Sequence, residues 1–226
     1  MTQRPARAMR YGRQRIARGS MAGFSGVAFA IALAALPFGP DHAEAQGEPL
    51  APFAGQKVSV MPVQFLRVDS TAPVKPQNWA SVRRELDDSI GVAIAERGIG
   101  KKWAYAADIE RMAKRNAVYV SDPSSLGAGG LRNRALKAGE PAPPVLINNL
   151  RPMIALGDSR FSLIPVELGF AGSGVERHAV LRLVLLDGRV GQIVWYADLP
   201  GVASASFGSA DIGALAQRIA DLVVSR

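Results

Sequence analysis

The order of apolar patterns along the chain constrains its fold more than any other feature. Residues 57–63 carry valine at alternate positions, which is typical of a strand, and Pro62 marks the strand's end because proline cannot donate to a ladder. From Trp79 to Ile94 apolar residues recur every three or four positions, which predicts an amphipathic helix capped by Asn78. The same reasoning predicts strands over residues 103–106, 161–170, 179–186 and 192–198. It also predicts helices over residues 108–115, 145–156 and 209–224, the first of these capped by Asp108 and the last by Ser209.

The resulting order is β-α-β-α, a long loop, a short helix and then β-β-β-α. A strand, a helix and a second strand in succession indicate a parallel crossover, and three strands joined by tight turns indicate a meander. Asp187 to Gly191 is a hairpin signal between the last two strands. We therefore predict an α/β (α+β) fold with a single mixed β-sheet of about five strands and helices packed on it, preceded by a signal peptide.

The first 45 residues have the three parts of a signal peptide. Six arginines and no acid lie in residues 1–18, residues 21–38 are uncharged and mostly apolar, and Ala43 and Ala45 form an A-x-A cleavage motif. We predict a signal peptide over residues 1–45, a linker over 46–56 and a single domain over 57–226, located in the periplasm or outside the cell. The alternative is an uncleaved inner-membrane anchor, since about 20 apolar residues can span a bilayer.

Net charge argues against nucleic acid as a partner. The formal charge is +8, with 27 basic and 19 acidic residues, but six of the basic and two of the acidic residues precede residue 46. The remainder has 21 basic and 17 acidic residues, so most of the positive excess belongs to the leader. The chain has no cysteine, which excludes disulfides, thiolate metal sites and a cysteine nucleophile.

A long loop over residues 116–144 is the least regular part of the predicted domain. It holds clustered glycines and prolines with Arg132, Arg134 and Lys137 between them. One interpretation is a contact with an anionic surface, either a membrane or an anionic polymer, or with a partner protein. The other is a solvated loop. Nucleic acid is disfavoured here too, because no aromatic residues are interleaved for base stacking.

No residue pattern indicates catalysis, and we expect no cofactor and no metal. His178 is the single histidine after the leader and is interpreted as a strand residue exposed to solvent. Gly169, Gly172 and Gly174 precede a strand and so predict a turn, because a phosphate site needs a following helix. The acids Glu85, Asp87 and Asp88 beside Arg83 and Arg84 are interpreted as a solvated helix face instead of an acid pair for glycan hydrolysis.

Short stretches of the chain resemble a known class of envelope domain. The opening V-S-V-M-P-V strand, the D-I-E-R-M helix from Asp108 and the L-D-G-R-V-G-Q-I-V-W hairpin ending at Trp195 follow the element order of that class. The pattern is similar to the amino-terminal domain of TolB and to domains of the curli-secretion lipoprotein and of the lipoproteins that activate penicillin-binding proteins. The resemblance implies a non-catalytic domain that docks other envelope proteins. The lipid-modified cysteine of the lipoproteins and the carboxy-terminal propeller of TolB have no counterpart here.

These observations lead to three hypotheses about function. The first is an exported, non-catalytic envelope accessory protein that docks envelope proteins whose identity is unknown. The second is an exported enzyme with a dispersed active site, and the third is a periplasmic domain that binds a small ligand. An open sheet edge or apolar patch would favour docking, a deep pocket with convergent carboxylates an enzyme, and a closed apolar pocket a ligand-binding domain.

Overall fold

The fold is described from a computed structural model, which describes residues 50–67, 73–75, 78–99 and 101–224. The predicted signal peptide, its cleavage residues Ala43 and Ala45, and the first part of the predicted linker lie outside the described residues. Within the described part of the chain, no helix combines the length and the apolar character needed to cross a membrane.

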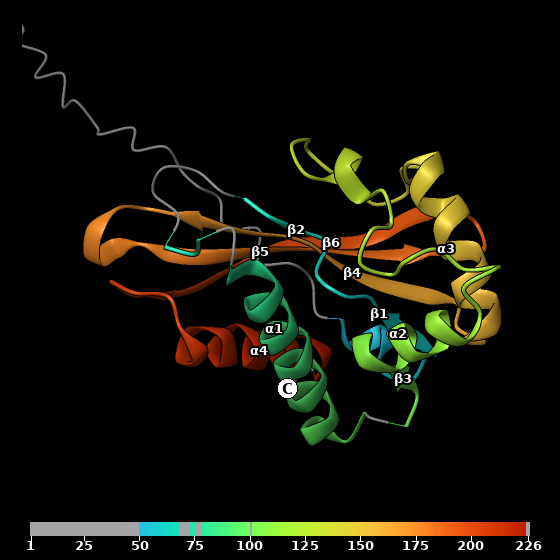
Figure 1. Ribbon diagram of the computed structural model, residues 1–226, viewed down its shortest axis with the longest axis horizontal. Coiled ribbons are helices and arrows are strands. Elements are labelled where there is room, and N and C mark those ends of the chain that lie inside the picture. Colours follow the sequence, from blue (N-terminus) through green and yellow to red (C-terminus); the bar gives the residue numbers. More distant parts are fainter. Residues whose placement is uncertain (1–49, 68–72, 76–77, 100, 225–226) are drawn as a thin grey trace, which may run out of the picture. The chain divides into compact units, whose positions relative to one another are not determined.

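The sheet is mixed, as predicted, and its strands follow the order β3-β1-β4-β5-β6, with β2 also paired to β4. β1 runs parallel to both β3 and β4, while β4, β5 and β6 form an antiparallel meander (Figure 1). The strands are β1 (Val58–Val60), β2 (Phe65–Leu66), β3 (Trp103–Ala104), β4 (Phe161–Ala171), β5 (His178–Asp187) and β6 (Gln192–Ala203). The parallel crossover and the meander inferred from the sequence are therefore both present.

Pro62 interrupts the first predicted strand, and the chain then resumes along β4 as β2. The N–H groups of Met61 and Gln64 still donate to carbonyls of β4, at 2.9 and 3.0 Å. The break is local because a proline has no N–H for the ladder but leaves the neighbouring positions free to pair.

The helices begin and end close to their predicted positions. They are α1 (Trp79–Ile94), α2 (Ala106–Arg115), α3 (Pro144–Leu156) and α4 (Ser209–Val223). The predicted caps are corrected: Asp108 and Ser209 lie inside their helices, because Tyr105 and Gly208 occupy the capping positions, and Asn78 makes no side-chain capping bond. Asp108 still supports its helix, because its carboxylate accepts from the N–H of Tyr105 at 3.4 Å.

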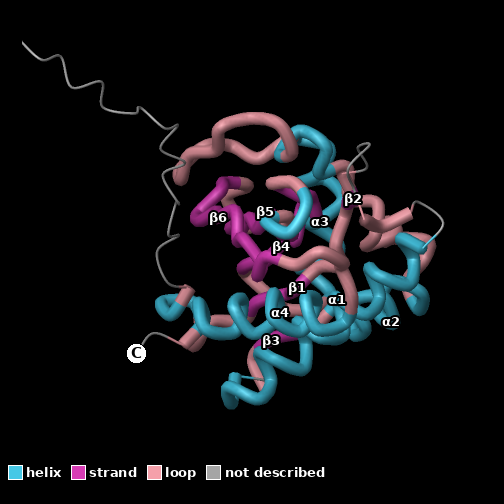
Figure 2. Tube along the Cα trace, turned by 90° about the vertical axis from the view of Figure 1, so that its left-hand side faces the viewer, coloured by secondary structure: helices cyan, strands magenta, loops and turns pink. Residues whose placement is uncertain are grey.

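The two faces of the sheet carry separate apolar cores. The first core packs α1 and α4 against alternate residues of β4, β5 and β6, including Leu163, Leu183 and Ala197. The second packs α3, one side of α2 and residues 120–142 against the other face, including Ile164 and Val184. Figure 2 shows α1 and α4 lying together below β4, β5 and β6. Both helices are amphipathic, so one apolar stripe on each suffices to cover this face.

Two segments expected to lack structure of their own are packed. Residues 116–144 contain a short 3-10 helix, Ala128–Leu131, and bury Leu126, Leu131 and Leu136 in the second core. In the predicted linker, Leu50 is fully buried and the ring of Phe53 packs edge-on against Phe161, with centroids 5.1 Å apart. The sequence did not predict this packing, because these segments bury single leucines and have no periodic apolar stripe that would indicate a buried face.

Candidate functional site

A buried carboxylate, Glu167, anchors a network of arginines on the sheet face that carries the second core. Glu167 lies in β4 and is 3% exposed. Arg67, which follows β2, donates from Nε to its Oε2 at 2.9 Å, and Arg132 donates from Nε to its Oε1 at 2.6 Å. A buried carboxylate is stable only when its charge is compensated, and the two guanidinium groups supply that compensation.

The three basic residues singled out in the sequence lie in different surroundings. Arg132 is held by Glu167 and stacks its guanidinium 4.6 Å from the centre of the Phe65 ring. Arg134 pairs with Glu140 at 3.0 Å. Lys137 is exposed, and it makes no ion pair with any residue that the structure describes. Of the three, Arg132 compensates the buried charge of Glu167, Arg134 forms an ion pair with Glu140, and Lys137 is exposed.

Arg182 connects this network to the edge of the sheet. It lies on β5, directly between Glu167 on β4 and Asp198 on β6. Its Nε and Nη2 donate to the two carboxylate oxygens of Asp198, each at 2.7 Å, and this pairing raises the pKa of Arg182 above its usual value. Its Nη1 also donates to the carbonyls of Leu131 and Arg134, at 3.2 and 3.3 Å. Arg182 therefore binds the segment that carries Arg132 and Arg134 to the sheet, next to β6.

β6 is the outermost strand of the meander and its outer side is partly open. Pro200 lies opposite Val180 on β5 and has no N–H to exchange, so this pair is not hydrogen-bonded. Antiparallel pairs alternate, so the N–H and C=O groups of Tyr196 and Asp198 point away from β5. Among the described residues, no backbone group outside the β5–β6 pair bonds to them.

The first part of β6 already accepts an additional strand. The N–H of Gly139 donates to the carbonyl of Ile193 at 2.7 Å, and the N–H of Ile193 donates to the carbonyl of Glu140 at 2.9 Å. Pro141 then forms an antiparallel bridge with Gln192. The chain therefore covers its own edge at residues 191–193 with an extended segment, and the outward-pointing groups of Tyr196 and Asp198 lie beyond that cover.

Asp87 corrects the prediction that the acids of α1 all face solvent. The residue is 9% exposed, and its Oδ1 accepts from the N–H of Val63 at 2.9 Å. Burial raises its pKa from 3.8 to about 7, against the lowering effects of that hydrogen bond and of Arg83. The position could have been found, because Asp87 precedes the buried Ile94 by seven residues and so lies on the same side of the helix.

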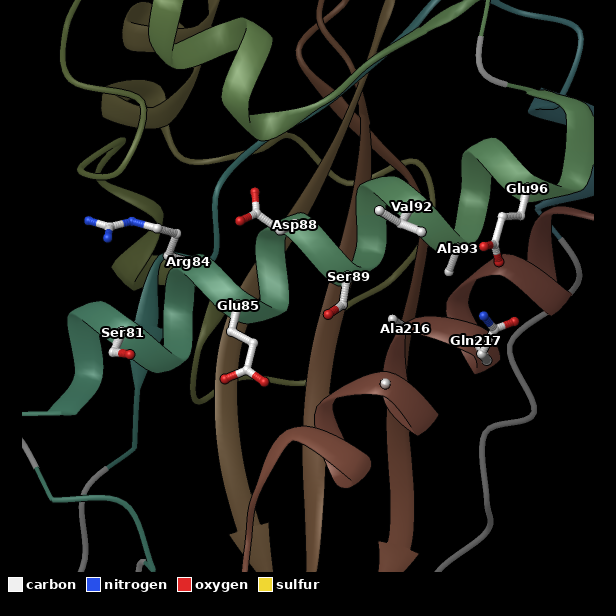
Figure 3. A pocket seen from close by; sticks show the side chains of 11 residues that line it. Ser81, Arg84, Glu85, Asp88, Ser89, Val92, Ala93, Glu96, Ala216 and Gln217 are labelled. Carbon is white, nitrogen blue, oxygen red and sulfur yellow. The ribbon is translucent and has the colours of Figure 1, made fainter.

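A groove of about 530 Å³ runs between α1 and α4, and its shape argues against hydrolysis by paired acids. In Figure 3, Glu85 of α1 and Glu96 of the π-helical turn that follows α1 (Ala95–Ile99) point toward α4, whereas Arg84 and Asp88 point away. Glu85 and Glu96 are eleven residues apart, or about 16 Å along the helix at 1.5 Å per residue, while glycosidase carboxylates lie about 5–9.5 Å apart. The residues that line the groove from α4 are Gly213, Ala216 and Gln217, which supply no acid.

The remaining candidates of the sequence have structural surroundings. His178 begins β5, with its Nδ1 3.1 Å from the carbonyl oxygen of Glu176. Gly172 and Gly174 have positive φ values in the β4–β5 connection, so they form a turn as predicted. Gly169 is not part of that turn, because it lies within β4 and pairs with Val180. In the described part of the chain, no three histidine, cysteine, aspartate or glutamate side chains are grouped to hold a metal ion.

Comparisons with known proteins found similar solved structures only at low identity. No family model and no curated protein match the chain. Similar solved structures include LpoB of E. coli, with 12% identity, a TM-score of 0.37 and coverage of 88% of this chain and 89% of that chain. The PelC dodecamer of Paraburkholderia phytofirmans has 14% identity and a TM-score of 0.35, and the match covers 76% of this chain and 90% of that chain. Hypothetical protein CT253 of Chlamydia trachomatis has 14% identity and a TM-score of 0.31, and the match covers 74% of this chain and 91% of that chain. These TM-scores lie below 0.5, so no property of these proteins is carried over to this chain.

Proposed function

We propose that this chain is an exported, non-catalytic accessory protein of the bacterial envelope that acts by docking other proteins. The observation that carries the proposal is the outer side of β6, where the backbone groups of Tyr196 and Asp198 point away from the sheet. An unpaired strand edge is a template for a strand of another chain, and this mode of recognition needs no catalytic residues.

The cavities support docking over the other two hypotheses. The groove between α1 and α4 is open and lacks converging carboxylates, which is unlike the deep polar pocket of an enzyme. The second cavity, beside Asp87 and Arg83, is about 80 Å³ and is bordered mostly by charged residues. It is far smaller than the roughly 300–1,000 Å³ of a small-molecule site. The groove between α1 and α4 has a volume in that range, but it is open and is not the closed apolar pocket that the ligand-binding hypothesis predicts.

Export is supported by the residue pattern of the leader, and it is tested by the mature amino terminus. We expect fractionation to place the full chain outside the cytoplasm and amino-terminal sequencing to begin at Gln46. Ala45→Arg should block processing because a large side chain does not fit a small-residue cleavage site, whereas Ala45→Ser should be processed normally. Cytosolic protein with Met1 through Ala45 still attached, and no membrane association, would contradict the proposal.

Docking is tested by chemical cross-linking in intact cells that express the processed chain at its natural level. We expect one or a few envelope proteins to be recovered reproducibly by mass spectrometry, with cross-linked lysines on the domain. An equally exported unrelated domain serves as the control for abundance. If the cross-linked set matches that control, the docking function is wrong.

A further inference from the structure

We propose that the open part of β6 binds an extended acidic segment of a partner protein, which pairs antiparallel with residues 196–199 as an additional strand. This proposal rests on the proposed docking function and specifies the surface and the chemistry of the partner. The template is within the chain itself, because Gly139 and Glu140 already pair in this way with Ile193 on the same edge. A partner strand would extend this row of hydrogen bonds along β6, beyond the point where residues 139–140 stop pairing with it.

The acidic character follows from the charges beside the edge. The arginine network and the segment 131–140 beside it contain five basic and three acidic residues, so two positive charges are in excess. The basic residues are Arg67, Arg132, Arg134, Lys137 and Arg182, and the acidic residues are Glu140, Glu167 and Asp198. Lys137 lies two residues before Gly139, which itself contacts β6, so its backbone is close to the edge, and it makes no ion pair with any residue that the structure describes. Asp198 is already neutralised by Arg182 and does not oppose an acidic ligand.

The two faces of the sheet predict which side chains should alternate along the partner strand. Tyr196 and Asp198 are partly exposed on the face of the arginine network, with Tyr196 37% exposed. Ala197 and Leu199 belong to the apolar core on the opposite face. A strand added beside them would therefore place one set of alternate side chains near the basic residues and the other set beside the apolar layer. Alternating acidic and apolar residues satisfy both faces.

The edge also has features that limit indiscriminate pairing. Pro200 cannot donate a backbone hydrogen bond. The pairing register is also irregular on both sides of the open stretch, between residues 193 and 195 on one side and beyond residue 200 on the other. Such devices restrict edge-to-edge aggregation. The open stretch is therefore short, and side-chain charge must contribute to the choice of partner.

The test uses the processed chain and a fluorescein-labelled peptide of alternating glutamate and valine residues, about ten residues long. Fluorescence anisotropy should show at least about ten-fold tighter binding than to the matching peptide of alternating lysine and valine, because a charge of the wrong sign beside the edge opposes docking. Binding should weaken as salt concentration rises. Equal affinity for the two peptides, or no binding of the acidic one, would overturn the proposal.

Two pairs of variants separate the contributions of backbone and charge. Tyr196→Pro removes one outward N–H and should lower affinity about ten-fold or more, whereas Tyr196→Ala keeps that N–H and should lower it less. Lys137→Glu should lower affinity by a similar factor, while Lys114→Glu makes the same change of charge on α2 and should have no effect. An equal loss in Lys137→Glu and Lys114→Glu would contradict a local contact.

Hydrogen exchange makes the test independent of whether Tyr196→Pro folds. In the unaltered chain, the acidic peptide should slow exchange of the Tyr196 and Asp198 amides and leave α2 unchanged. If these amides are protected without peptide and the chain is a dimer by light scattering, a second copy occupies the edge and the acidic partner is excluded. If the peptide fails here while cross-linking still recovers envelope proteins, docking survives and uses another surface.

Discussion

Asp87 provides the sharpest test of the structure, because this residue lies on the buried side of α1 and its carboxylate has a pKa near neutrality. Its Oδ1 accepts from the N–H of Val63, and Arg83, Asp88 and Glu110 are the charged groups around it. Burial raises its pKa from 3.8 to about 7, so the folded chain holds a proton that the unfolded chain has released. Between about pH 4 and pH 7 the free energy of unfolding should therefore fall as pH rises, by up to about 1.4 kcal/mol per pH unit.

The substitution Asp87→Asn removes this ionisation and keeps the acceptor for Val63. An amide is neutral at every pH, so the variant should differ little from the original chain near pH 4. Above pH 7 it should be more stable by about 4 kcal/mol at most, which is the cost of the whole shift of about three pKa units. The small cavity beside Asp87 gives water access to the carboxylate, which would lower this figure.

The measurement is urea denaturation from pH 4.5 to 8, followed by tryptophan fluorescence, with Asp88→Asn as the matched control. Asp88 is exposed, so its substitution should change the free energy of unfolding by less than about 0.5 kcal/mol. Taking the difference between variant and original chain at each pH cancels the titration of all other groups. A difference that stays constant across this range would refute the reasoning, because it would mean that Asp87 does not titrate there.

Three further predictions concern the segment over residues 116–144 and the network beside it. Gln64→Leu should cost about 2–4 kcal/mol in urea denaturation and expose the segment to limited proteolysis, because the buried amide donates to the carbonyl of Pro123 and accepts from the N–H of Leu126, which would lose their partner. Glu167→Gln should cost about 2–3 kcal/mol by thermal denaturation, since two arginines lose their shared carboxylate; an unchanged midpoint would show that the network contributes nothing. Gly127→Ala should destabilise the chain by more than about 1 kcal/mol, because Gly127 has a φ of 79° and a new Cβ would lie 2.8 Å from a side-chain carbon of Val145. Gly129→Ala is the control for that change, since a Cβ there meets nothing within 4 Å, and equal effects of the two would contradict the argument.

The partners of the basic residues could not be predicted from the sequence. Arg132 binds Glu167 of β4 and Arg182 binds Asp198 of β6, and these acids are 35 and 16 residues away along the chain. Glu167 was visible as a single acid inside an apolar strand, and a buried acid of that kind requires a basic partner. Which arginines fill that role depends on how β2 and the 3-10 helix approach β4.

The local patterns of the sequence determined the helices, the meander and the mixed sheet, because a period of two or of three to four residues shows which side of each element is apolar. Tertiary structure decided the rest: Asp87 is buried, residues 116–144 contribute to the core, and Tyr196 and Asp198 direct backbone groups outward. These outcomes depend on which strand lies outermost and on which distant segment covers it. Periodicity cannot reveal them, because a strand has the same alternation whether its edge is paired or open.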